Sequence, residues 1–163
     1  MPNILQKIDE LIVTGAVQFI TSEHFNIDTS GDALVKISYL GKNFPVWFGN
    51  KVECDIPPST LTYSTLMQGA SDPEIISALG GAEKAETHLA QMFYLMSLQP
   101  HGENGILLND GGVNFFYIKD ITGTLRTIRL LWQDGGWGIH AIRPLDPLNL
   151  PIWNAGSQVF SRE

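Results

Sequence analysis

The stretch LLWQDGGWGIH, at residues 130–140, constrains the fold of this chain more than any other feature. Asp134-Gly135 separates two runs in which apolar residues alternate with others. Asp-Gly between such runs is the strongest short-range signal for a β-hairpin, because both central residues of a type I′ turn need positive φ. The turn fixes the register, which gives one apolar face made of three pairs: Trp132 with Trp137, Leu130 with Ile139, and Ile128 with Ala141.

The same period of two covers the chain from Gly105 onward and predicts four strands, at residues 105–109, 112–119, 124–133 and 136–144. Asp110-Gly111, the DITG loop at 120–123 and Asp134-Gly135 separate them. The sequence therefore predicts a four-stranded antiparallel meander.

Two segments carry apolar residues at helical spacing. Residues 3–20 predict an amphipathic helix, and residues 82–99 predict a central helix that Pro100 ends. A shorter helix is predicted from Ser71, because Glu74 follows the candidate N-cap by three residues, and Gly80 stops it. Between these segments, residues 33–41 and 44–50 read as two short strands.

Residues 55–72 form a Pro/Ser/Thr-rich connection. A connection of that length is functional, mobile, or contains a strand around Leu61–Leu66. The whole chain, 1–163, suits a single domain. We expect an α+β fold with a curved antiparallel sheet that ends in the meander, and with the N-terminal and central helices packed on one face.

The closing segment RTIRLLWQDGGWGIHAIRP, residues 126–144, resembles the last hairpin of the cone-shaped rolls related to nuclear transport factor two. The resemblance implies a curved sheet that can enclose a cavity. It carries none of that family's active-site residues.

Composition excludes several classes of function. The formal net charge is −7 and the ten basic residues are scattered, which argues against a nucleic-acid partner. The single cysteine, Cys54, excludes an intramolecular disulfide. No segment has the pattern of a signal peptide or a membrane span, so we expect a cytoplasmic protein. Charged residues make up only 17% of the chain, which leaves surface for a partner or for a homodimer.

The familiar catalytic and cofactor motifs do not fit. Gly136, Gly138 and Ala141 match a dinucleotide fingerprint by letter, but they lie inside a predicted strand rather than before a helix. Neither His88 nor His140 has a second metal ligand at helical or strand spacing. We therefore expect no metal and no cofactor.

The second face of the hairpin is the candidate site. Arg129 lies opposite His140 there, and Leu131 and Ile142 are more apolar than a wholly solvated face requires. A four-residue DITG loop would add Asn114 to this row, whereas a three-residue loop would instead bring up Phe115 and Tyr117. Arg129 either binds a carboxylate of a partner or pairs with one of this chain's own carboxylates.

The C-terminal tail, residues 144–163, carries Trp153 among several apolar anchors that follow or flank its prolines. Such a segment wraps its own sheet or reaches another subunit, and packing on its own domain is favoured.

These features predict a non-enzymatic binding protein. Its sheet face or tail, with Arg129, His140, Asn114, Leu131, Ile142 and Trp153 as candidate contacts, engages another protein or a second copy of the chain. The alternative is a pocket enzyme of the cone-shaped type that binds a small molecule, with His140 as acid or base and Arg129 as anion anchor.

Overall fold

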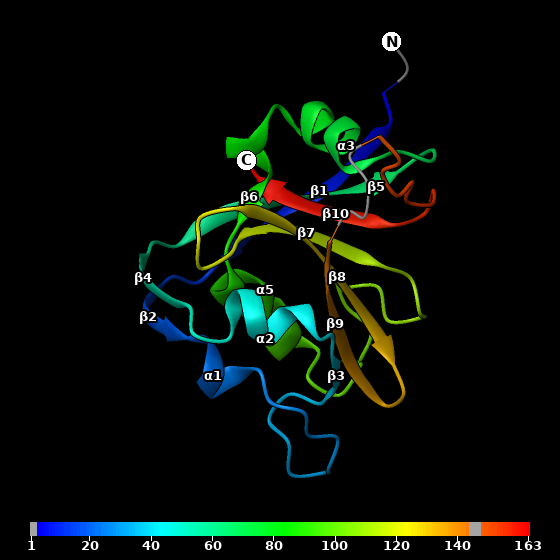
Figure 1. Cartoon of the computed structure of the whole chain (residues 1–163). Helices are drawn as coiled ribbons and strands as arrows, with labels where there is room; N and C mark the ends of the chain where they lie inside the picture. The colour runs from blue at the N-terminus through cyan, green and yellow to red at the C-terminus, as the bar shows by residue number, and fades with distance from the viewer. Residues whose placement is uncertain (1–2, 144–147) are drawn as a thin grey trace.

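The computed structural model describes residues 3–143 and 148–163 as an α+β fold (Figure 1). Within these residues eight strands form one mixed sheet and two more form a small sheet. The strands are β1 (Leu5–Val13), β2 (Ala16–Ile20), β3 (Ile37–Leu40), β4 (Val52–Ile56), β5 (Ser59–Leu66), β6 (Glu86–Thr87), β7 (Asn114–Lys119), β8 (Leu125–Gln133), β9 (Gly136–Ile142) and β10 (Gln158–Arg162). The helices are α1 (Thr21–His24), α2 (Asn43–Phe48), α3 (Asp72–Leu79), α4 (Ala82–Ala85) and α5 (Leu89–Leu98).

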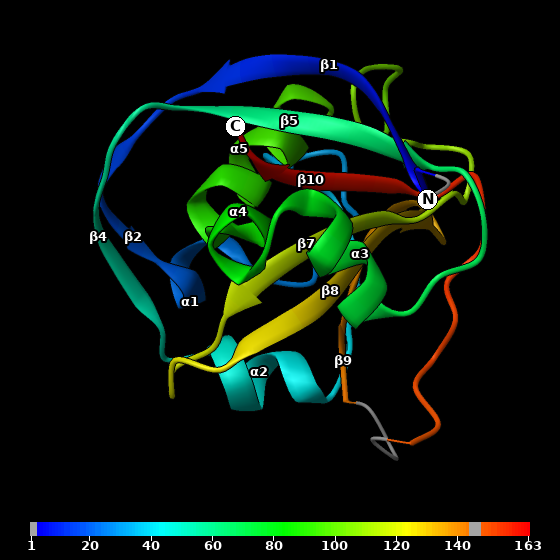
Figure 2. The same ribbon diagram turned by 90° about the horizontal axis from the view of Figure 1, so that it is seen from above.

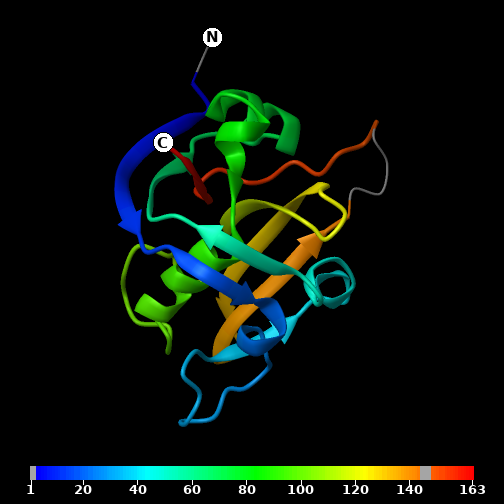
Figure 3. The ribbon, with the colours of Figure 1, turned by 90° about the vertical axis from the view of Figure 1, so that its left-hand side faces the viewer.

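The main sheet has the strand order β1-β5-β10-β7-β8-β9-β3, and β6 pairs with β7. Most pairs are antiparallel, as predicted. The pairs β10–β7, β3–β9 and β6–β7 are parallel, so the prediction of a purely antiparallel sheet is wrong. The small sheet, β2–β4, continues the β1–β5 ribbon after a bend, and the two ribbons curve around one side of the molecule (Figure 3). Gly15 lies at this bend, where a Cβ atom would come within 2.3 Å of the Ile56 carbonyl oxygen.

Helices cover both faces of the sheet, not one face as predicted. Helix α5 packs Leu89, Met92 and Leu95 into the larger apolar core, whereas Ile75 of α3 packs into a second cluster on the opposite face (Figures 1 and 2). The reason lies in β7, whose residues from Asn114 to Ile118 are all buried. A strand that is apolar on both faces needs a covering layer on each side.

Residues 3–20 do not form the predicted helix. They form β1 and β2, and β1 pairs with β5. A β-bulge between Lys7 and Asp9 explains the misleading spacing. The extra residue turns later side chains to the other face. Leu5 therefore packs in the α3 cluster while Val13 packs in the larger core, and the apolar spacing imitates a helix.

The prediction of two short strands within residues 33–50 is correct for the first strand and wrong for the second. Strand β3 lies inside the first predicted strand, but residues 44–50 were predicted as a strand and Asn43–Phe48 form helix α2 instead. Proline in the first turn of a helix removes only a donor that has no partner there. Phe44 and Phe48, four residues apart, are buried on one face of α2 and stack with their ring centroids 5.3 Å apart.

The helix predicted from Ser71 is confirmed as α3. Ser71 and Glu74 form the capping box, and Gly80 ends the helix with φ of 106°. The predicted central helix, 82–99, divides into α4, the short strand β6 and α5. It breaks because Glu86 and Thr87 pair with β7, after which His88 caps α5.

The predicted meander contains three strands rather than four. Residues 105–109 lie in the loop between α5 and β7, where Leu107 hydrogen-bonds to the Gln99 side chain. The position beside β7 that they were expected to occupy is taken by β10, from the predicted tail. The connection 55–72 contains β5, which confirms the third of its three alternatives.

None of the helices in the described residues is long and apolar enough to cross a bilayer.

Candidate functional site

The β8–β9 hairpin has the predicted register. Asp134 and Gly135 adopt φ of 52° and 79°, as a type I′ turn requires. Trp132 pairs with Trp137, Leu130 with Ile139, and Ile128 with Ala141. Arg129 accordingly lies directly opposite His140, on the face that α5 does not cover.

Asn114 does not join this row. Strand β7 pairs Phe115, not Asn114, with Arg129. The alternative with Phe115 and Tyr117 on the Arg129 face is the one observed, but the loop between β7 and β8 has five residues, 120–124, and not the three that this alternative assumed. Asn114 is fully buried on the opposite face, where its side chain donates to the carbonyls of Leu108 and Leu130 and accepts from the Leu108 N–H. Asn114 therefore holds the loop before β7.

The guanidinium of Arg129 is half-buried and has no hydrogen-bond acceptor among the residues that the structure describes. No carboxylate within the described residues forms an ion pair with it, and its Nε is an enclosed side-chain atom without a partner. Its Cζ lies 5.4 Å from the ring centre of Trp153. Burial lowers the pKa of Arg129, but a guanidinium stays charged at any physiological pH. The site therefore presents one positive charge that the described chain does not neutralise.

Trp153 reaches this face from the segment between β9 and β10. A backbone bridge joins it to Ala70, and its indole Nε1 donates to Asp72 Oδ1 at 2.7 Å. The same carboxylate accepts the Tyr117 hydroxyl at 2.8 Å. The described part of the tail therefore contacts the rest of this chain through Trp153. Residues 144–147 of the predicted tail lie outside the described residues.

His140 forms the other side of the site. It is half-buried, and its ring centroid lies 4.9 Å from that of Tyr39, which is 44% exposed. Burial, and then the charge of Arg129, lower the pKa of His140. Both effects favour the neutral form of the imidazole. Leu131 and Ile142 are half-buried on the same strand face.

A second cluster of polar side chains surrounds Glu53 of β4. It was not predicted from the sequence. Glu53 is 5% exposed, and its two carboxylate oxygens accept the N–H groups of Leu89 and Ala90 at 2.9 Å each, at the start of α5. Lys51 Nζ lies 3.3 Å and His88 Nδ1 3.8 Å from Glu53 Oε2. Burial raises the pKa of Glu53, but these hydrogen bonds and the Lys51 charge outweigh it, and the pKa is lowered. No local pattern joins residues 35 positions apart.

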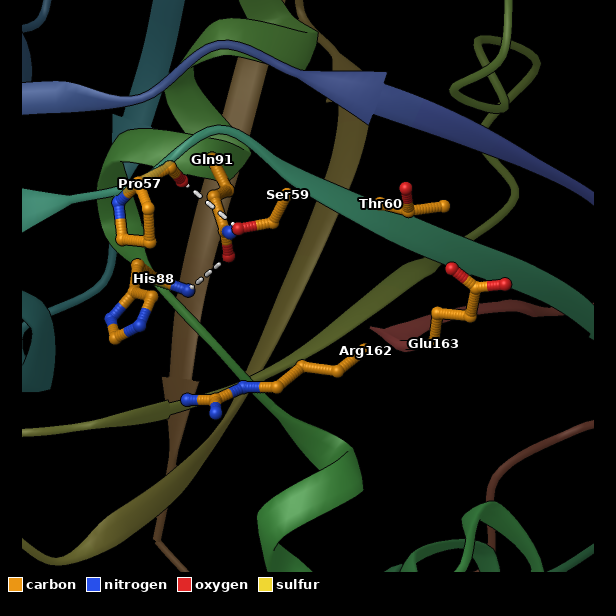
Figure 4. Close-up of a pocket in the computed structure, with 7 residues that line it drawn as sticks. All are labelled: Pro57, Ser59, Thr60, His88, Gln91, Arg162 and Glu163. Atoms are coloured by element: carbon orange, nitrogen blue, oxygen red, sulfur yellow. Dashed lines mark hydrogen bonds between the residues drawn. The ribbon is translucent and has the colours of Figure 1, made fainter.

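Hollows occur away from the Arg129 face. One of about 370 Å³ lies beside the Glu53 cluster and is lined by Pro57, Ser59, Thr60, His88, Gln91, Arg162 and Glu163 (Figure 4). Another, of about 540 Å³, is lined by residues of α1, the loop that follows it, and α5. Arg129 and His140 line neither hollow. Across the described positions, no group of three or more His, Cys, Asp or Glu side chains converges as metal ligands.

Comparisons with protein families, with curated proteins and with solved structures found no match for this chain.

Proposed function

We propose that this protein is a binding protein whose β8–β9 face, completed by Trp153, receives a carboxylate of a protein partner. The observation that carries the proposal is Arg129. It is half-buried and charged, and it lacks an acid partner in the described chain although the protein has 17 acidic residues. A guanidinium held in this way is the strongest side-chain donor for a carboxylate.

The surroundings favour a protein over a small ion as the source of the carboxylate. Leu131 and Ile142 are half-buried beside the polar pair. Ile152, next to Trp153 in the chain, is 60% exposed. Tyr39, whose ring lies against that of His140, is 44% exposed. Aromatic and aliphatic side chains around a central arginine are the typical composition of a protein interface.

The alternative is the pocket enzyme with His140 as acid or base. Its supporting feature is an imidazole whose pKa is lowered beside a fixed positive charge, because the neutral form can accept a proton from a bound acid. His140 lines neither of the two hollows described above, which favours the binding protein.

The test uses two peptides that differ in one charge, acetyl-Leu-Glu-Leu-amide and acetyl-Leu-Gln-Leu-amide, titrated into the ¹⁵N-labelled protein. We expect the Glu peptide to shift the Arg129 Nε–H and Trp153 Nε1–H resonances, and the Gln peptide to bind at least about tenfold more weakly. Arg129→Met should abolish the difference. Arg143→Met, at an exposed arginine just beyond β9, is the matched control and should preserve it. Equal binding of both peptides, or unchanged binding by Arg129→Met, would refute the proposal.

A further inference from the structure

The hollow beside the Glu53 cluster contains a polar group that the fold leaves unused. Gln91, on the first turn of α5, is only 2% exposed. Its Oε1 accepts the His88 N–H at 2.9 Å, which orients the amide because an N–H group requires an oxygen opposite it. The amide nitrogen then faces away from the helix start, and it has no acceptor among the described residues. Figure 4 shows the amide between Pro57 and Ser59, with its oxygen directed toward the backbone N–H of His88.

Other unsatisfied groups surround the same space. The Ser59 hydroxyl donates to the Pro57 carbonyl at 2.9 Å and so keeps its lone pairs for an incoming donor. The Thr60 hydroxyl also lines the hollow and makes no hydrogen bond with the described chain. His88 turns Nδ1 toward Glu53, which leaves Nε2 as an acceptor. Hence both donors and acceptors are available within one small volume.

Two cations beside the hollow already have acceptors. Arg162 Nη2 lies 3.3 Å from Glu86 Oε1, and Arg162 Nε donates to the Glu86 carbonyl at 2.7 Å. Lys84 Nζ donates to the Glu163 carbonyl oxygen at 2.6 Å. This arrangement differs from the Arg129 face, where the guanidinium has no counterpart among the described residues. An anionic ligand would therefore find neither of these cations free, and the exposed Glu163 carboxylate, which also lines the hollow, would repel it.

We infer that this hollow binds a neutral polyhydroxylated molecule of monosaccharide size. Hydroxyl groups donate and accept, so they satisfy Gln91 Nε2 and the lone pairs of Ser59 and His88 together. The ring of Pro57 supplies an apolar surface for the C–H face of such a ring. A volume of about 370 Å³ lies at the lower end of the range for small-molecule sites. The inference is independent of the function proposed for the Arg129 face.

The experiment is a titration of the ¹⁵N-labelled protein with glucose, galactose and mannose, and separately with inorganic phosphate as an anionic probe. We expect at least one sugar to shift the Gln91 side-chain NH₂ resonances, with a dissociation constant on the order of 1 mM. Phosphate should leave them in place. The inference would be overturned if phosphate shifted these resonances and none of the sugars did. It would also be overturned if none of the probes shifted them.

Two variants localise the effect. Gln91→Glu keeps an oxygen for the His88 N–H but removes the free donor, and should weaken sugar binding about tenfold. Thr60→Val tests the site without touching the helix cap and should weaken it severalfold. Gln18→Glu, on exposed β2, is the matched control and should leave binding unchanged. Sugar binding that is equal in the wild type, Gln91→Glu and Thr60→Val would also contradict the assignment.

Discussion

Strand β8 carries two arginines, three residues apart, whose surroundings differ in one respect. Arg126 Nε lies 2.8 Å from the buried Asp120 carboxylate, and its Cζ is 3.9 Å from the ring centre of Trp47. Arg129 also lies over an indole, that of Trp153, but it has no carboxylate in the described chain. Both arginines therefore have the aromatic neighbour, and only Arg126 has the acid.

The difference separates a structural arginine from one that is available for binding. The Asp120 carboxylate accepts four hydrogen bonds, from Thr122, Thr124 and Arg126, and so closes the β7–β8 turn. The Trp153 indole, which lies beside Arg129, donates its Nε1–H to Asp72. The Asp72 carboxylate therefore accepts hydrogen bonds from Trp153 and Tyr117 and not from Arg129. A stacked arginine without an acid is thus a clearer pointer to a ligand site than stacking alone.

Replacement of each arginine by methionine gives the largest expected difference. Arg126→Met leaves the Asp120 charge buried without its cation and should lower the free energy of unfolding by about 2–3 kcal/mol. Arg129→Met removes a donor that is already unpaired, so its effect should stay within about 1 kcal/mol. Urea denaturation at pH 7 measures both. Equal losses would show that Arg129 has a structural partner after all.

Of the two arginine sites, only that of Arg126 should contribute to the loss of stability at acid pH. Burial raises the pKa of Asp120, but the hydrogen bonds from Thr122, Arg126 and Thr124 outweigh it and lower the pKa to about 2. The unfolded chain takes up the proton first as the pH falls, so a stabilisation of up to about 2 kcal/mol, complete above about pH 5, is lost toward pH 2.

Asp120→Asn should remove this part of the pH dependence, whereas Arg129→Met should retain it. Urea midpoints measured between about pH 2 and pH 7 give the comparison. If Arg129→Met reduced the loss of stability at low pH as much as Asp120→Asn does, the two arginine sites would not differ in the proposed way.

An acid placed opposite Arg129 should convert its site into one like that of Arg126. His140→Glu puts a carboxylate at the cross-strand position and should raise the free energy of unfolding by about 0.2–1 kcal/mol. It should also abolish binding of the Glu peptide, because the guanidinium is then occupied. His140→Gln, which adds no charge, serves as the control. Undiminished peptide binding by His140→Glu would count against Arg129 as the anchor.

The smallest expected effect is on the pKa of His140. Arg129 contributes to its lowering after burial, so Arg129→Met should raise the His140 pKa toward its ordinary value. The remaining burial keeps the pKa below that value. Arg126→Met should leave it unchanged, since Arg126 pairs with Ile118 and not with β9. NMR titration of the imidazole C–H resonances measures both, and a shift of equal size in the two variants would contradict the assignment.

The sequence predicted the parts of this molecule that short-range rules govern. Asp134-Gly135 gave the hairpin and hence the Arg129–His140 pair, and Ser71 with Glu74 gave α3. Trp153 was singled out as an anchor of the tail, but its position over Arg129 was not. That position depends on Ala70 and Asp72, which are more than 80 residues away along the chain.

The errors arose where pairing between distant segments decides the structure. Gln158–Arg162 is too short and too mixed in composition to read as a central strand, yet it lies between β5 and β7 and displaces residues 105–109 from the meander. The Glu53 cluster and Gln91 went unnoticed for the same reason, because β4 and α5 meet only in the folded chain.

The bulge near Ile8 has a consequence for how this protein meets copies of itself. Strand β1 is an edge of the main sheet, and Ile8 and Ile12 on it are exposed by 52% and 75%. A straight apolar edge would offer an unbroken row of N–H and C=O groups on which another strand could grow. The bulge interrupts that row, and the Lys7–Glu10 ion pair places charge beside the gap. The irregularity that disguised β1 as a helix therefore also protects its edge against aggregation.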